Sequence, residues 1–110
     1  MLLATDFWVG ALIRRAEQGG AFPVVVRKGD ARAGAVLVKV LNRADGSTRL
    51  YAEATGMDGE QVWMQPARSE VEPDLDRYIE RAVRIDPDIW VIEIDDRQGR
   101  HFLTERVEAA

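Results

Sequence analysis

The sequence predicts an α+β fold in which an antiparallel sheet is covered on one face by two helices. Apolar residues recur at three- and four-residue spacing in two segments, residues 5–20 and 69–86, which is the helical period. The remaining segments contain runs rich in β-branched residues, which favour strands. Short turn sequences separate successive runs, as in an antiparallel meander. The expected element order is α-β-β-β-β-α-β-β.

Length and composition are typical of one small globular domain. The chain of 110 residues is predicted to form a single domain over residues 1–110, since no repeat or linker divides it. It has no cysteine, which excludes disulfides and thiolate nucleophiles and suits a reducing cytosol. The apolar N-terminal run lacks a basic region and is interrupted at Arg14, unlike a signal peptide. No apolar run approaches the ~20 residues of a membrane span. We therefore expect a cytoplasmic protein without a membrane partner.

The first helix is expected to begin at Thr5 or Asp6, either of which can act as an N-cap, and to end at residues 19–20. Gly10 lies inside this helix, where glycine costs stability, and so predicts close packing of a neighbouring element. The apolar face consists of Trp8, Val9, Leu12, Ile13 and Ala16.

Four strands are expected next, at residues 21–29, 35–42, 48–54 and 60–66. Pro23 near the start of the first run predicts an edge strand or a strand entry, because proline lacks a backbone donor. Turn sequences, including an Asp-Gly pair, connect the four runs as hairpins.

The second helix is expected to start with a capping box formed by Ser69 and Glu72, with Pro73 tolerated in the first turn. Asp86 precedes a proline and should end the helix. Its apolar stripe consists of Val71, Leu75, Tyr78, Ile79, Ala82 and Val83.

The final segment, residues 88–105, is predicted to be a hairpin. Asp96 and Gly99 occupy the first and fourth positions of a type I turn. The resulting register places Phe102 opposite Ile94 on the apolar face, whereas a shift of one residue would turn Phe102 outward.

The same register brings the only histidine, His101, to one face with Asp95 and Glu93. A carboxylate beside an imidazole can orient it for general acid–base catalysis, with Arg97 or Arg100 binding an anionic substrate. The alternative is a cross-strand ion pair worth about 0.2–1 kcal/mol. Ion pairs are common at hairpin tips, so the pattern favours the alternative.

Arg27, Lys28 and Arg32 surround a glycine-containing loop that could bind an anion or an acidic partner. The loop lacks the ending and the following helix of a nucleotide-binding P-loop, and a solvated, charged connection explains it better.

Trp63 alternates with Val62 and Met64 beside two glutamines, which leaves open whether it is exposed. An exposed Trp63 would mark a partner or dimer surface, whereas a buried one would belong to the core. Trp8 and Trp90 fall on apolar faces and are expected in the core.

Charge and ligand spacing argue against metal and nucleic acid. Residues 1–55 carry eight Lys or Arg against five Asp or Glu, and residues 56–110 carry seven against fourteen. The cations are scattered, whereas nucleic-acid binding favours clustered ones. The carboxylates of residues 86–95 with a single histidine lack the spacing of a metal site. No cofactor is expected.

Two blocks of sequence, residues 8–40 and 86–103, resemble the signature blocks of a short bacterial family, the domain of unknown function numbered 1491. They cover about half of the chain. The resemblance implies a family and a length, and it implies no activity, cofactor or catalytic residue.

The leading hypothesis is a small non-enzymatic binding or interaction module. It would use the uncovered sheet face or an edge for self-association, for example as a homodimer, or for a protein partner. A monomer with Trp63 buried would count against it. The alternative is a small enzyme that uses His101 with Asp95 and Glu93 on an anionic small molecule, against which an exposed His101 with an unshifted pKa would count.

Overall fold

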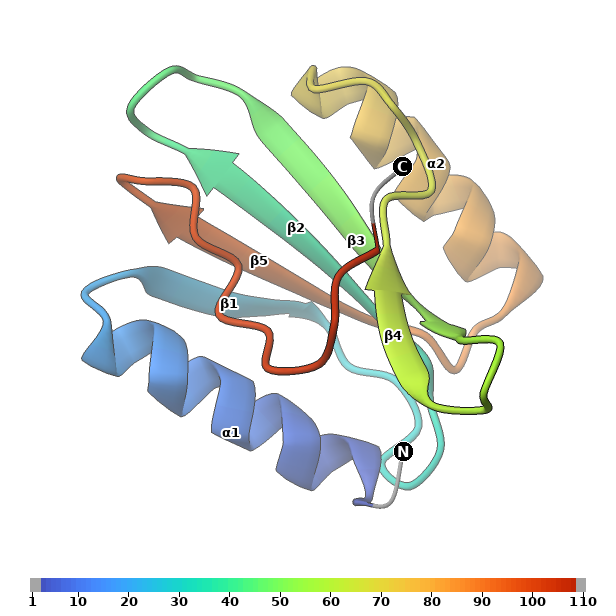
Figure 1. Cartoon of the computed structure of the whole chain (residues 1–110). Coiled ribbons are helices and arrows are strands. Elements are labelled where there is room, and N and C mark those ends of the chain that lie inside the picture. The colour runs from blue at the N-terminus through green and yellow to red at the C-terminus, as the bar shows by residue number, and fades with distance from the viewer. Residues whose placement is uncertain (1–2, 109–110) are drawn as a thin grey trace.

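The computed structural model of the protein describes residues 3–108, and this part of the chain forms two helices and one sheet of five strands (Figure 1). The helices are α1 (Thr5–Gln18) and α2 (Glu72–Ile85). The strands are β1 (Phe22–Arg27), β2 (Val36–Asn42), β3 (Thr48–Thr55), β4 (Gln61–Met64) and β5 (Trp90–Asp96). The predicted α+β class is confirmed.

The strands lie in the order β1-β5-β2-β3-β4. The β2–β3 and β3–β4 pairs are antiparallel neighbours, as the turn sequences predicted. β5 lies between β1 and β2, antiparallel to the first and parallel to the second. The expectation of a wholly antiparallel sheet is therefore wrong, because β5 inserts between β1 and β2 and runs parallel to β2.

The two helices cover opposite faces of the sheet, not one face as predicted. On β2, Val36, Val38 and Val40 pack with the α1 side chains Trp8 and Leu12. The intervening Leu37 packs with Leu75 of α2. Successive strand residues point to opposite faces, so β2 and β5 are enclosed between the helices.

The predicted last strand does not form. The turn at Asp96 is as expected, since the Gly99 N–H donates to the Asp96 carbonyl and Gly99 has a φ of 69°. Both edges of β5 are already occupied by β1 and β2, so residues 100–103 have no free edge to pair with. The C-terminal segment (residues 97–108) instead crosses the α1 side of the sheet and reaches β4, where Trp63 pairs with Val107 (Figure 1).

Three local predictions about the helices also need correction. Thr5 does not cap α1 with its side chain, and its hydroxyl donates to the Gly34 carbonyl at 2.9 Å. Gly10 is exposed, with open space where a Cβ would lie, so no element packs closely against it. The capping box at Ser69 is not formed, because Glu72 bonds Lys39 instead. Neither helix within residues 3–108 is long and apolar enough to cross a membrane.

Candidate functional site

Glu93 and Asp95 lie on the α2 side of β5, because they alternate with Ile92 and Ile94 of the α1-side core. Glu93 Oε2 lies 3.2 Å from the buried ammonium of Lys39 on the neighbouring strand β2. Asp95 accepts a hydrogen bond of 2.7 Å from Arg43 Nε. Each of these carboxylates is thus held by a cation from β2 or from the turn that follows it.

His101 lies on the opposite side of the sheet, in the C-terminal segment. Its ring meets that of Tyr51 edge-on with centroids 5.1 Å apart, and Tyr51 belongs to the α1-side core. Its Nδ1 accepts a hydrogen bond from the Leu103 N–H at 2.9 Å. Burial lowers the pKa of the imidazole. The structure therefore does not bring His101 together with Asp95 and Glu93, since the predicted hairpin register is absent.

Lys39 joins α2 to the sheet. Its side chain is buried, and Nζ lies 2.8 Å from both Glu72 and Asp76 of α2. Burial opposes the charge, but the hydrogen bonds that Lys39 donates to Asp76 and Glu72, together with Glu93, raise the pKa of Lys39. The cluster thus favours the charged form of Lys39 and ties α2 to the strands β2 and β5.

Trp63 is fully buried (0% exposed), and the prediction that it marks a partner surface is wrong. Its ring stacks on that of Trp8 with centroids 5.2 Å apart. Both indole N–H groups donate to Glu105 of the C-terminal segment, Trp63 to Oε1 at 3.0 Å and Trp8 to Oε2 at 3.2 Å. The sequence around Trp63, with its two glutamines, does not indicate this burial, because the C-terminal segment that covers Trp63 lies far away in sequence.

The loop with Arg27, Lys28 and Arg32 connects β1 to β2 across β5. Arg27 is half-buried, and Lys28 and Arg32 are exposed. Both loop glycines pack against the backbone of Asp88, where an added Cβ would lie within 2.3 Å of its carbonyl oxygen. Close packing explains the glycines, and the exposed Lys28 and Arg32 lie in a loop that contacts its own chain.

The two edges of the sheet differ in how they are covered. The edge at β4 is joined to the C-terminal segment, since Trp63 N–H donates to the Arg106 carbonyl at 2.8 Å and Glu108 N–H donates to the Trp63 carbonyl at 2.7 Å. The opposite edge is β1, which pairs only with β5 among the described strands (Figure 1). The edge position of β1 agrees with the prediction from Pro23.

β1 exposes an unusual amount of apolar surface. Phe22 is 73% exposed and Val24 is 52% exposed, and both lie on the α2 side because they pair with Asp95 and Glu93. Val25 and Val26 are exposed as well, and the register shifts between Val25 and Arg27. A run of exposed apolar residues on a strand edge is a feature that interaction sites share.

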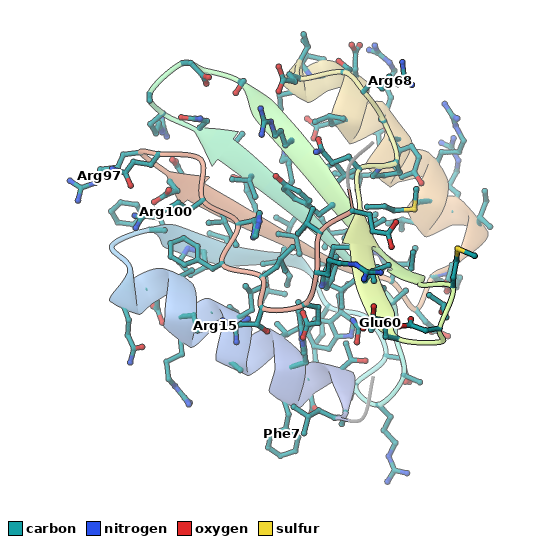
Figure 2. All side chains as sticks on the ribbon, in the orientation of Figure 1. Phe7, Arg15, Glu60, Arg68, Arg97 and Arg100 are labelled. Carbon is teal, nitrogen blue, oxygen red and sulfur yellow. The ribbon has the colours of Figure 1, made fainter. Side chains whose placement is uncertain are left out.

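An open depression of about 690 Å³ adjoins the start of β1 and is lined by Gly20, Phe22, Arg43, Asp95 and Arg97. It lies beyond the carboxyl ends of the parallel strands β5 and β2, where ligands commonly bind in sheets with parallel strands. Arg97 extends away from the end of β5 into solvent (Figure 2). The hydrogen bond from Arg43 lowers the pKa of Asp95, so this carboxyl is ionised at neutral pH.

β1 and the depression together form the candidate site, which we call the β1 surface. It is defined by Phe22, Val24, Val25, Val26, Arg43, Asp95 and Arg97. Within residues 3–108, no three His, Asp or Glu side chains are arranged to hold a metal ion. Sequence reasoning missed Phe22, Val24 and Arg43, although the unbroken apolar run after Pro23 was a signal for Val24.

Comparison with known proteins identifies relatives over the whole described chain. The family model of a protein of unknown function, DUF1491, matches residues 3–104. The crystal structure of a DUF1491 family protein from Caulobacter crescentus CB15 is 72% identical, with a TM-score of 0.95, and covers 97% of this chain and 100% of that chain. An NMR structure of a DUF1491 family protein from the same organism is 72% identical, with a TM-score of 0.92 and 99% coverage of both chains.

A more distant structure has the same fold. The solution structure of protein Atu0922 from A. tumefaciens is 31% identical, with a TM-score of 0.82, and covers 99% of this chain and 98% of that chain. No match is found among the curated proteins.

Proposed function

Because the chain belongs to the DUF1491 family of proteins of unknown function, we propose its role from its own geometry: it is a non-enzymatic binding module that accepts an extended segment of another protein along β1. The single observation that supports this most strongly is the contrast between the two sheet edges. The C-terminal segment covers the β4 edge, whereas no segment within residues 3–108 covers the more apolar β1 edge.

Strand addition would use both the backbone and the side chains of β1. A free edge offers unpaired N–H and C=O groups to an added strand, and the exposed side chains offer apolar contact on alternate residues. Phe22 and Val24 face the α2 side, which α2 leaves uncovered at this end of the sheet. The added strand would bury them.

Two features of β1 limit indiscriminate pairing. Pro23 removes one backbone donor, and the register shift between Val25 and Arg27 interrupts the regular ladder. Such features blunt edge strands against aggregation. They do not cover the apolar side chains, so we propose that they restrict pairing to a segment of matching shape.

Photo-crosslinking from the β1 surface tests the proposal. A photoreactive amino acid at Val24 should yield a discrete adduct in the native cells, identified by mass spectrometry. Phe7 is the matched control site, because it lies on the outer side of α1 with the same 73% exposure as Phe22. When the photoreactive amino acid is placed at position 22 instead, the additional substitution Val24→Lys should remove the adduct. Equal adducts from positions 7 and 24, or none from position 24, would contradict strand addition.

A further inference from the structure

We infer that the segment accepted by β1 is acidic, and that one of its carboxylates lies in the depression beside Arg97 and Arg43. This inference rests on the strand addition proposed above and adds the chemistry of the partner. It also selects between a foreign segment and a second copy of the chain.

The charges around the depression favour a carboxylate. It is lined by two arginines and one carboxylate. Arg43 donates two hydrogen bonds to Asp95, one from Nε and one from Nη2, which fixes the guanidinium and leaves Nη1 outside this pair. Arg97 is exposed and has no carboxylate within salt-bridge distance in residues 3–108. Because Arg43 already pairs with Asp95, Arg97 is the cation that a carboxylate of the partner would pair, since guanidinium donors match carboxylate oxygens.

The register places this charge beside an added strand. Phe22, the first residue of β1, pairs directly with Asp95, so the depression adjoins the start of the free edge. Arg97 follows β5, the neighbour of β1, so an added strand would lie two strand spacings, or about 10 Å, from β5. The extended side chains of an arginine and of an Asp or Glu together span this distance. An Asp or Glu of that strand next to Phe22 would point its carboxylate toward Arg97.

A second copy of the chain fits this position poorly. Antiparallel pairing of two β1 strands about a two-fold axis opposes the start of one strand to the end of the other. Arg27 and Lys28 of one copy would then approach Arg97 of the other. Asp30 follows Lys28 by two residues and lies outside β1, and its carboxylate accepts hydrogen bonds from the N–H groups of Arg32 and Ala33. Like charges at both ends disfavour self-pairing, whereas an acidic segment meets cations at both ends.

Peptides of opposite charge test the inference. The probes are capped peptides with a Val-Thr-Val-Thr-Val centre and, at one end or the other, a pair of Asp, Lys or Ser residues. Backbone amide shifts of β1 in the full chain are followed by NMR at low salt. An Asp-ended peptide should bind about fivefold more tightly than the Lys-ended one, and the difference should shrink at high salt. Arg97→Glu should reverse the preference, whereas Arg14→Glu on α1 should leave it unchanged.

The outcomes separate the two proposals. If all peptides shift the β1 amides equally, with or without Arg97, the acidic-partner inference is wrong and strand addition stands. If no peptide shifts them, both proposals fail. Sedimentation at high protein concentration completes the test, because a dimer whose β1 amides become protected would overturn the choice of partner.

Discussion

At the residue scale, the least expected feature is the burial of Asp96 at the end of β5. The side chain is 1% exposed and accepts hydrogen bonds from the backbone N–H groups of Gln98 and Arg100 and from the Arg100 guanidinium. Arg100 also donates to the Gly19 carbonyl at the end of α1. Asp96 thus links the turn after β5 to the C-terminal end of α1, which local turn chemistry alone does not indicate.

Asp96→Asn should lower the free energy of unfolding by about 2 kcal/mol, because Arg100 and the turn amides lose a charged acceptor in a buried position. Urea denaturation at neutral pH measures the change. Asp95→Asn is the neighbouring control, and it should cost less than about 1 kcal/mol because its partner Arg43 is largely exposed. Equal losses for the two variants would contradict the special role of Asp96.

The hydrogen bonds from Arg100 lower the pKa of Asp96 to about 2 from an ordinary value of 3.8. A carboxyl whose pKa falls on folding stabilises the folded state above the unfolded pKa and loses that contribution as pH falls through the folded pKa. The difference in stability between the native chain and Asp96→Asn should therefore shrink between about pH 4 and pH 2.

His101 provides a second titration. Burial lowers its pKa below the ordinary value of 6.5, so NMR of the imidazole should give a midpoint below 6.5. The folded chain favours the neutral imidazole. Its contribution to the free energy of unfolding is therefore fully present above about pH 6.5, and it is lost as the pH falls and the histidine takes up a proton. His101→Gln should remove this decline. A midpoint above 6.5 would show that a carboxylate approaches the ring in solution.

At the element scale, the sequence predicted where helices and strands lie better than it predicted their ends. Both helices and the first five strands occur where periodicity and composition placed them. The caps at Thr5 and Ser69 failed for the same reason, since tertiary partners compete for the capping groups. A local motif cannot reveal that Gly34 or Lys39 will be nearby.

Gly10 gives a direct test at this scale. Gly10→Ala should raise the free energy of unfolding by about 0.5–1 kcal/mol. Gly10 lies in the middle of α1, a Cβ there would meet no neighbouring atom, and alanine reduces the entropy of the unfolded chain. Thermal unfolding followed by circular dichroism measures the gain. Gly99→Ala should have the opposite sign, since Gly99 has a φ of 69° and an added Cβ would lie 2.5 Å from the Asn42 side chain.

At the scale of the whole molecule, strand order was the part that the sequence could not provide. Turn signals connect neighbours in sequence, but β5 enters between β1 and β2 through contacts that span most of the chain. One signal was present: in β2 the residues Val36, Leu37 and Val38 form an unbroken apolar run, typical of a strand buried on both faces. It pointed to helices on both sides of the sheet.

The same cause explains the candidate site. The predicted grouping of His101 with Asp95 required residues 100–103 to pair with β5, but β1 occupies that edge of β5. The turn at Asp96 was therefore predicted correctly, whereas the neighbour of His101 was not. The edge position of β1 was predicted from Pro23, a local property, and it is confirmed. The depression beside Phe22 combines β1, β5 and the turn after β2, and no local pattern indicates such a combination.

The unequal edges of the sheet lead to a final prediction. Glu105→Ala should lower the free energy of unfolding by about 2–3 kcal/mol, because the buried indole N–H groups of Trp8 and Trp63 lose their charged acceptor. Val24→Lys combined with Val26→Lys should cost less than about 1 kcal/mol, since both side chains already lie in solvent.

Amide hydrogen exchange should show the same contrast without any substitution. The N–H of Trp63, bonded to the C-terminal segment, should exchange slowly in the native chain and faster in Glu105→Ala. If Glu105→Ala and the double variant Val24→Lys with Val26→Lys lost equal stability, the β1 valines would belong to the core. The proposal that the β1 surface is a binding site would then be wrong. Loss at the β4 edge alone fits a chain that seals one edge of its sheet for stability and keeps the other free for a partner.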